Sequence, residues 1–124
     1  MKVQYLYVPD VVSCRSSDRL ADAARLLRRA GIGAMPVLDD DDALIGIISE
    51  RDLAGALADK ADPVAVEVDD YATRSVAVAG PAEDSSAVGR RMLEAGIRHL
   101  PVLDGDRVVG MVSMRDLLAV ESWA

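Results

Sequence analysis

The sequence predicts a mixed fold, α/β (α+β), built from two consecutive β-α-β-β-α repeats. The first observation is an internal repeat, because residues 31–53 and 96–117 carry similar residues in the same order. The second is that each copy alternates a helical apolar pattern with short apolar runs typical of strands. The third is the length of 124 residues, which allows one compact domain or two half-domains that share a core.

The repeated stretch reads GIGAMPVLDDDDALIGIISERDL in the first copy and GIRHLPVLDGDRVVGMVSMRDL in the second. Gly31 pairs with Gly96, and the same spacing holds as far as Asp39 and Asp104. One extra residue in the acidic turn of the first copy then shifts the pairing, after which Arg-Asp-Leu recurs in both. Such a repeat constrains the architecture before any other feature. It predicts repeat 1 at residues 5–58, a linker at 59–66 and repeat 2 at 67–121.

The first half of repeat 1 predicts a strand and a helix. Residues 1–8 are an apolar leading segment, and a short strand is expected at Val11–Cys14. The Ser-Ser-Asp run at 16–18 supplies residues that favour a helix N-cap. An apolar stripe at helical spacing then consists of Leu20, Ala23, Ala24 and Leu27. Gly31 is expected to end this helix, as glycine commonly does at a C-terminal cap.

The second half of repeat 1 predicts a β-hairpin and a second helix. Apolar runs at Ala34–Leu38 and Leu44–Ile48 flank the acidic turn Asp39–Asp42. That turn lacks the ligand spacing of a calcium loop, so we interpret it as a solvated loop. Ser49 is expected to cap the helix, with Asp52 at the third helical position. The buried side of this helix is predicted to carry Leu53, Ala56 and Leu57.

Repeat 2 predicts the same order of elements. Ser75–Ala79 matches the first strand, and the helix that follows is expected to end at Gly96. The apolar stripe of that helix consists of Val88, Met92 and Ala95. Strands expected at His99–Leu103 and Arg107–Val112 flank an Asp-Gly turn, which is a strong hairpin signal. Ser113 is expected to begin the last helix.

Composition excludes several classes of function. A net charge of −7 argues against binding to nucleic-acid phosphates, which requires a basic face. The single cysteine, Cys14, excludes an internal disulfide and a cysteine-rich zinc site. The sequence shows no signal peptide and no apolar run near the roughly 18 residues of a membrane span, so we expect a cytoplasmic protein. With one histidine and no nucleophile beside a base, we expect neither an enzyme nor a metal site.

The repeated motif resembles the cystathionine β-synthase (CBS) domain, and the tandem pair resembles a Bateman module. Gly-Ile-x-x-x-Pro-Val-Leu-Asp occurs in both copies. The stretches that follow it run from Gly46 to Asp52 and from Gly110 to Asp116. Both match the family's pattern of glycine, a hydrophobic residue, any residue, Ser or Thr, two residues and Asp. The resemblance covers about residues 5–120 and implies two repeats related by a pseudo-two-fold axis.

The resemblance implies a ligand that contains adenosine. In the family, such pairs bind these ligands in clefts between the repeats, where the aspartate chelates the ribose hydroxyls and the Ser or Thr helps to hold ribose or phosphate. Physical chemistry agrees, since a carboxylate can accept both hydroxyls of a vicinal diol and a helix N-terminus offers N–H groups to phosphate. We expect AMP, ADP or ATP as a regulatory ligand, with S-adenosylmethionine as a further possibility and no required cofactor.

The resemblance also implies that each cleft draws on both repeats. Cleft 1 would be lined by Ser49, Arg51, Asp52, Val76, Ala77, Val78, Arg98, His99, Leu100 and Pro101. Cleft 2 would be lined by Val11, Val12, Ser13, Gly33, Ala34, Met35, Pro36, Ser113, Arg115 and Asp116. Cleft 1 has Arg98 and His99 where cleft 2 has glycine and alanine, so we expect the nucleotide in cleft 1.

The sequence is compatible with two functions. One is an energy or metabolite sensor that acts in trans on an unknown protein target. The other is a structural homodimerisation module whose clefts bind no ligand. The resemblance implies a homodimer in either case. Helix capping alone accounts for Asp52 and Asp116, a surface salt bridge for Arg51 and Arg115, and a structural role for His99. Loss of nucleotide binding in a folded Asp52→Ala variant separates the two functions.

Overall fold

Two compact units make up the fold, and they do not coincide with the two sequence repeats. The structure is a computed structural model that describes residues 1–7, 9 and 11–121. The middle unit is Val12–Val76, and the terminal unit combines Met1–Val11 with Ala77–Ala124. The chain therefore passes from one unit to the other twice, after residue 11 and after residue 76.

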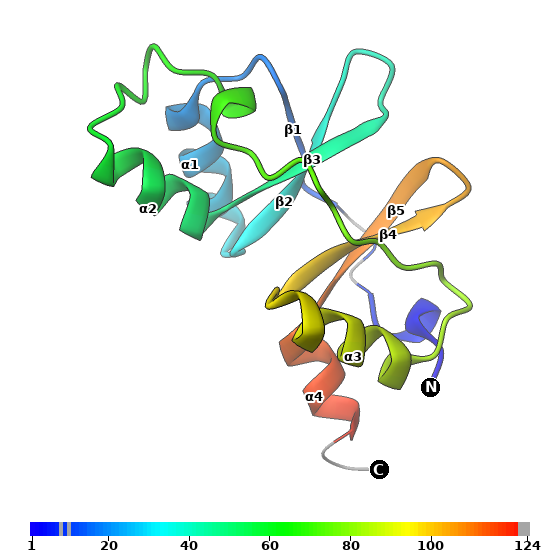
Figure 1. Cartoon of the computed structure of the whole chain (residues 1–124). Helices are drawn as coiled ribbons and strands as arrows, with labels where there is room; N and C mark the ends of the chain where they lie inside the picture. Colours follow the sequence, from blue (N-terminus) through cyan, green and yellow to red (C-terminus); the bar gives the residue numbers. More distant parts are fainter. Residues whose placement is uncertain (8, 10, 122–124) are drawn as a thin grey trace. The chain divides into compact units, whose positions relative to one another are not determined.

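The middle unit has the predicted β-α-β-β-α order, followed by a short 3-10 helix. Its elements are β1 (Cys14–Arg15), α1 (Leu20–Ala30), β2 (Ala34–Leu38), β3 (Leu44–Ser49), α2 (Glu50–Ala58) and η2 (Val68–Asp70). β1 pairs in parallel with β2, which pairs antiparallel with β3, so the sheet order is β1-β2-β3. α1 makes the crossover between the parallel strands and contacts α2 (Figure 1).

The helix α1 confirms the predicted helix but not its predicted cap. The residue before the helix is Arg19, whose backbone N–H donates to Asp22 at 3.2 Å. Asp18, from the predicted capping run, instead accepts the Arg15 N–H at 2.8 Å in the turn after β1. Gly31 ends the helix as predicted, with a φ of 67° in the left-handed region that glycine adopts without strain.

The core of the middle unit follows most of the predicted apolar positions. It consists of Cys14, Leu20, Ala23, Leu27, Met35, Val37, Ile48, Ala56 and Val68. Two predictions about helix faces are wrong, because Ala24 is exposed and Leu57 is 81% exposed. The buried face of α2 carries Leu53 and Ala56, which pack into the core of the unit, whereas Leu57 lies outside this face.

The terminal unit has a smaller sheet than predicted. Its elements are η1 (Val3–Tyr5), α3 (Ser85–Ala95), β4 (His99–Asp104), β5 (Arg107–Ser113) and α4 (Met114–Glu121). β4 and β5 form an antiparallel pair, and α3 contacts α4 (Figure 1).

Both predicted first strands are too long. In the terminal unit only Ala79 of the predicted Ser75–Ala79 strand pairs, through a single parallel bridge to Val102. In the middle unit the strand begins at Cys14, and residues 11–13 form no ladder. Residues 75–78 form no ladder, and the Val78 carbonyl accepts a hydrogen bond from the Arg91 side chain rather than from a strand.

The terminal core is equivalent to the middle core. It consists of Val3, Ala79, Val88, Met92, Leu100, Val102, Val112 and Leu117. The stripe of α3 is confirmed at Val88 and Met92 but is wrong at Ala95, which is exposed in the last turn. No helix in the described residues is both long and apolar enough to cross a membrane.

Each unit is completed by the segment that leads into the first strand of the other repeat. In the terminal unit, Val3 is fully buried and donates its N–H to the Glu83 carbonyl at 2.9 Å, so the N-terminal segment lies beside α3 (Figure 1). In the middle unit, Val68 is fully buried and donates its N–H to the Asp18 carbonyl at 2.7 Å. The two units therefore exchange their equivalent leading segments.

Candidate functional site

The junction between β3 and α2 brings Ser49 and Asp52 together. The Ser49 Oγ accepts the Asp52 N–H at 3.2 Å. In return, the Asp52 Oδ2 accepts the Ser49 backbone N–H at 2.9 Å and the Ser49 hydroxyl at 3.0 Å. This is a capping box, which satisfies N–H groups that have no partner within the first turn of a helix. The predicted cap and the predicted position of Asp52 are thereby confirmed.

The junction between β5 and α4 repeats this arrangement. The Ser113 Oγ accepts the Asp116 N–H at 3.1 Å, and the Asp116 Oδ2 accepts the Ser113 N–H at 3.0 Å. Asp52 and Asp116 are both half-buried. Each repeat therefore presents a carboxylate that is held in place by its own serine at the start of a helix.

Thr73 makes the two junctions different, and the sequence reasoning missed it. The Thr73 hydroxyl donates to the Asp52 Oδ1 at 3.2 Å. The backbone of Thr73 is fixed by two hydrogen bonds to Ile47, of 2.8 and 2.9 Å. Gly46 permits this approach, because a Cβ at Gly46 would lie 2.8 Å from the Thr73 carbonyl oxygen. In the sequence repeat the residue that corresponds to Thr73 is Val8, which lies outside the described residues and has no hydroxyl.

Part of each helix N-terminus is already occupied by backbone carbonyls. The Glu50 N–H donates to the Gly33 carbonyl at 3.0 Å, and the equivalent Met114 N–H donates to the Arg98 carbonyl at 2.7 Å. In α2, the N–H groups of the first and third residues are therefore bonded, and fewer remain for a phosphate than the sequence suggests. Gly33 and Arg98, two of the predicted cleft residues, anchor the helices through their main chains.

The residues predicted for each cleft come from both units. The middle unit contains Ser49, Arg51, Asp52 and Val76 of cleft 1 and Val12, Ser13, Gly33, Ala34, Met35 and Pro36 of cleft 2. The terminal unit contains Ala77, Val78, Arg98, His99, Leu100 and Pro101 of cleft 1 and Val11, Ser113, Arg115 and Asp116 of cleft 2. The grouping into two clefts stays a prediction.

The residues predicted for the two clefts differ in burial, which decides whether their side chains could reach a ligand. Met35 and Leu100 are fully buried in the cores of their units, so their side chains serve packing. Arg51, Arg98 and Arg115 are exposed cations. His99 is half-buried at the start of β4, opposite Ser113 in the ladder.

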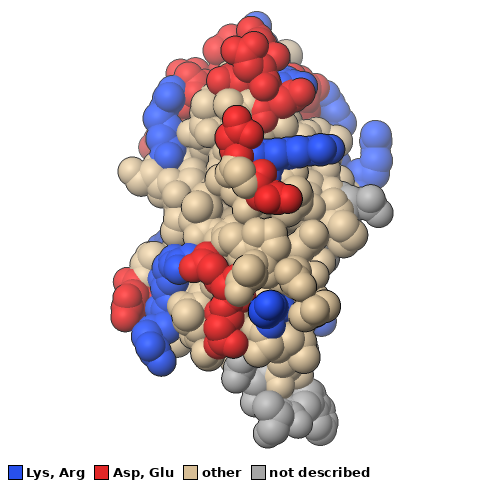
Figure 2. Space-filling model, turned by 90° about the vertical axis from the view of Figure 1, so that its right-hand side faces the viewer, with Lys and Arg blue, Asp and Glu red and all other residues tan. Residues whose placement is uncertain are grey.

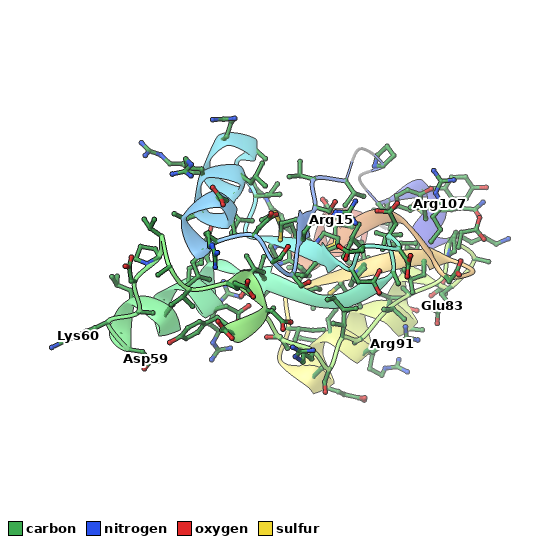
Figure 3. The ribbon with its side chains drawn as sticks, turned by 90° about the horizontal axis from the view of Figure 1, so that it is seen from above. Arg15, Asp59, Lys60, Glu83, Arg91 and Arg107 are labelled. Atoms are coloured by element: carbon green, nitrogen blue, oxygen red, sulfur yellow. The ribbon has the colours of Figure 1, made fainter. Side chains whose placement is uncertain are left out.

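Arg91 and Glu83 hold the segment that contains Val78. An Arg91 Nη1–H donates to the Val78 carbonyl at 2.6 Å. The Arg91 Nη2 lies 2.6 Å from a carboxylate oxygen of Glu83, and both of these residues are labelled in Figure 3. Glu83 also accepts the Gly80 N–H at 2.7 Å. The hydrogen bonds from Arg91 and from Gly80 lower the pKa of the Glu83 carboxyl. Neither residue belongs to a repeated motif, which is why sequence reasoning overlooked them.

Charge on the visible surface is mixed rather than basic. Figure 2 shows acidic side chains gathered at the top of the face in view, and Lys and Arg side chains interspersed with acidic ones elsewhere. This pattern agrees with the net charge of −7 and gives no support to a nucleic-acid interface on that face.

The family model of the CBS domain matches residues 3–59 and 68–122. Because the two matches cover most of the sequence, the chain belongs to the CBS domain family and contains a tandem CBS pair. The family that the repeated motif predicts is thereby confirmed.

Curated relatives share this region. An uncharacterized protein of Methanocaldococcus jannaschii is 34% identical over 124 residues, which are 98% of this chain and 44% of that protein. The inosine-5′-monophosphate dehydrogenase of Mycobacterium tuberculosis is 33% identical over 116 residues, which are 92% of this chain and 21% of that enzyme. The chain thus spans less than half the length of these relatives, and the likeness to the enzyme concerns that part alone.

Solved structures resemble the whole chain. The CBS domain pair of protein MJ0100, crystallised in complex with 5′-methylthioadenosine and S-adenosyl-L-methionine, gives a TM-score of 0.91 at 27% identity, over 99% of this chain and 97% of that chain. A putative signal-transduction protein with CBS domains from Burkholderia ambifaria gives 0.85 at 32% identity, over 92% and 85%. The fold class predicted from the sequence, an α+β Bateman module, is confirmed.

Proposed function

We propose that this chain is a regulatory module that binds an adenosine-containing ligand through the carboxylates of its Ser-x-x-Asp motifs. The observation that carries the proposal is the matched pair of half-buried aspartates, Asp52 and Asp116, each held by a capping serine. A carboxylate that is already ordered loses little conformational entropy when it accepts the two ribose hydroxyls. The complex of the MJ0100 pair with two adenosine derivatives supports adenosine as the recognised group.

The preferred ligand in this proposal is an adenine nucleotide (AMP, ADP or ATP) bound at the cleft 1 residues. Arg98 supports this choice, because it is exposed and its guanidinium stays charged at every physiological pH. The module would act without catalysis, as a cytoplasmic sensor of energy state that signals in trans to a protein target. Such a signal requires a ligand that binds two states of the module with different affinity.

Calorimetric titration with AMP, ADP, ATP and S-adenosylmethionine tests this function. Asp52→Asn retains an oxygen that can cap α2 but removes the charge that binds the diol. Glu50→Gln is the matched control, because it removes a charge from the same helical turn outside the capping box. We expect AMP affinity to fall roughly tenfold to a hundredfold in Asp52→Asn, because this is the change in affinity that the free energy of a hydrogen bond to a charged group produces. AMP affinity should stay unchanged in Glu50→Gln.

Two outcomes of this titration count against the proposal. Equal affinity for AMP in the wild type and in Asp52→Asn would show that Asp52 does not receive the ribose. Loss of affinity in Asp116→Asn alone would place the nucleotide at the cleft 2 residues instead.

A second candidate function is homodimerisation without a ligand. Leu57 on α2 and Leu93 on α3 favour it, because they are 81% and 73% exposed and large apolar side chains at the surface often mark contacts with another protein. The capping boxes also explain both aspartates without a ligand. A stable dimer by sedimentation, together with no heat from any of the four ligands, supports this function over the first.

A further inference from the structure

We propose that Thr73 is a specificity-determining residue, whose hydroxyl competes with a ribose diol for the Asp52 carboxylate. The inference rests on the proposed function of the Ser-x-x-Asp carboxylates as receptors for ribose. It goes further because it assigns a role to a residue outside both motifs and outside both predicted clefts. It also predicts that the two carboxylates, alike in sequence, differ in their intrinsic affinity for a diol.

Most acceptor positions of the Asp52 carboxylate are already occupied. A carboxylate has two oxygens and about four acceptor positions. Oδ2 of Asp52 already accepts two hydrogen bonds from Ser49, through its backbone N–H and its hydroxyl. Oδ1 accepts the Thr73 hydroxyl. A vicinal diol needs two acceptor positions, so it can bind in full only when the Thr73 hydroxyl gives up its position on Oδ1.

Asp116 provides the internal comparison. Its Oδ2 accepts one backbone N–H, from Ser113, and its Oδ1 accepts no hydrogen bond from the residues that the structure describes. The equivalent of Thr73 in the repeat is Val8, which cannot donate a hydroxyl hydrogen bond. Counting only donors in the described part of the chain, Asp116 therefore keeps enough acceptor positions for both hydroxyls of a ribose without any displacement.

Only the side chain of Thr73 has to move when a ribose replaces its hydroxyl on Asp52. Two hydrogen bonds to Ile47 hold its backbone against β3, beside Gly46. The side chain itself is exposed, so its hydroxyl can turn from Asp52 to water without disturbing these backbone bonds. Displacement therefore removes one charge-assisted hydrogen bond and leaves the fold intact.

The test compares two variants of the full chain that differ in one hydroxyl. Thr73→Val keeps the shape of the side chain and removes the donor, whereas Thr73→Ser keeps the donor and serves as the matched control. Each protein is titrated with AMP and with 2′-deoxy-AMP, which lacks one hydroxyl of the diol. Far-UV circular dichroism and the urea midpoint verify that each variant folds.

We expect Thr73→Val to bind AMP roughly threefold to tenfold more tightly than the wild type, the effect of one net hydrogen bond. Thr73→Ser should match the wild type, and 2′-deoxy-AMP should gain little from either change, because it cannot occupy both positions. Unchanged or weaker AMP binding in a folded Thr73→Val variant would overturn the inference while the proposed function stands. If neither wild type nor Thr73→Val binds AMP, the proposed function fails and this inference falls with it.

Discussion

The exchange of leading segments makes a quantitative prediction about Val68. This residue belongs to the leading segment of repeat 2 in the sequence, but its side chain is 0% exposed in the core of the middle unit. Val68→Ala removes two buried methyl groups, worth about 0.8 kcal/mol each in transfer free energy. A cavity term adds to this, so we expect the free energy of unfolding to fall by about 2–3 kcal/mol. That is a large share of the total stability, which is about 5–15 kcal/mol for a typical protein.

Urea unfolding of the full chain, followed by circular dichroism, measures this loss. Val64→Ala is the matched control, because Val64 lies in the same segment and is 71% exposed. Its effect should stay within about 0.5 kcal/mol. The equivalent change Val3→Ala should destabilise the terminal unit by an amount similar to that of Val68→Ala. Equal and small losses for Val68→Ala and Val64→Ala would refute the packing of this segment into the first repeat.

Two further predictions concern Cys14 and Gly46. Burial, and then the nearby Asp18 charge, raise the pKa of the Cys14 thiol from 9.0 to about 12. The thiol therefore ionises at a lower pH in the unfolded chain than in the folded chain. The stability that the neutral, buried thiol contributes is complete below pH 9 and is lost as the pH rises toward about 12. A Cys14→Ala variant that loses stability as steeply over this range would contradict this assignment. Gly46→Ala places a Cβ 2.8 Å from the Thr73 carbonyl oxygen, so it should destabilise the fold and disturb the Thr73–Asp52 hydrogen bond. If the NMR signals of Thr73 in this variant match those of the wild type, the close approach of Thr73 to Gly46 is contradicted.

The internal repeat made the local structure predictable from sequence. The hairpin strands, the glycine at the end of α1 and the capping box of Ser49 and Asp52 all depend on contacts within a few residues, which residue type and spacing determine. The helix faces were less predictable, as Leu57 shows, because which side of α2 is inward depends on what packs against it.

The longer-range features could not be predicted in the same way. A repeat shows that Val3 and Val68 occupy equivalent positions, but it does not show which repeat each of them packs against. The hydrogen bond from Thr73 to Asp52 follows from that choice of partner, since η2 brings Thr73 beside β3. A comparison of Thr73 with Val8 in the two leading segments is the signal in the sequence that could have shown this difference between the junctions.

A crystal structure of the full chain grown with AMP tests the central claim most directly. The proposal predicts both ribose hydroxyls within about 2.5–3.0 Å of the Asp52 carboxylate oxygens, with the Thr73 hydroxyl turned away from Oδ1. It also predicts that the capping bonds from Ser49 remain in place. An AMP molecule whose ribose hydroxyls contact neither Asp52 nor Asp116 would contradict the account.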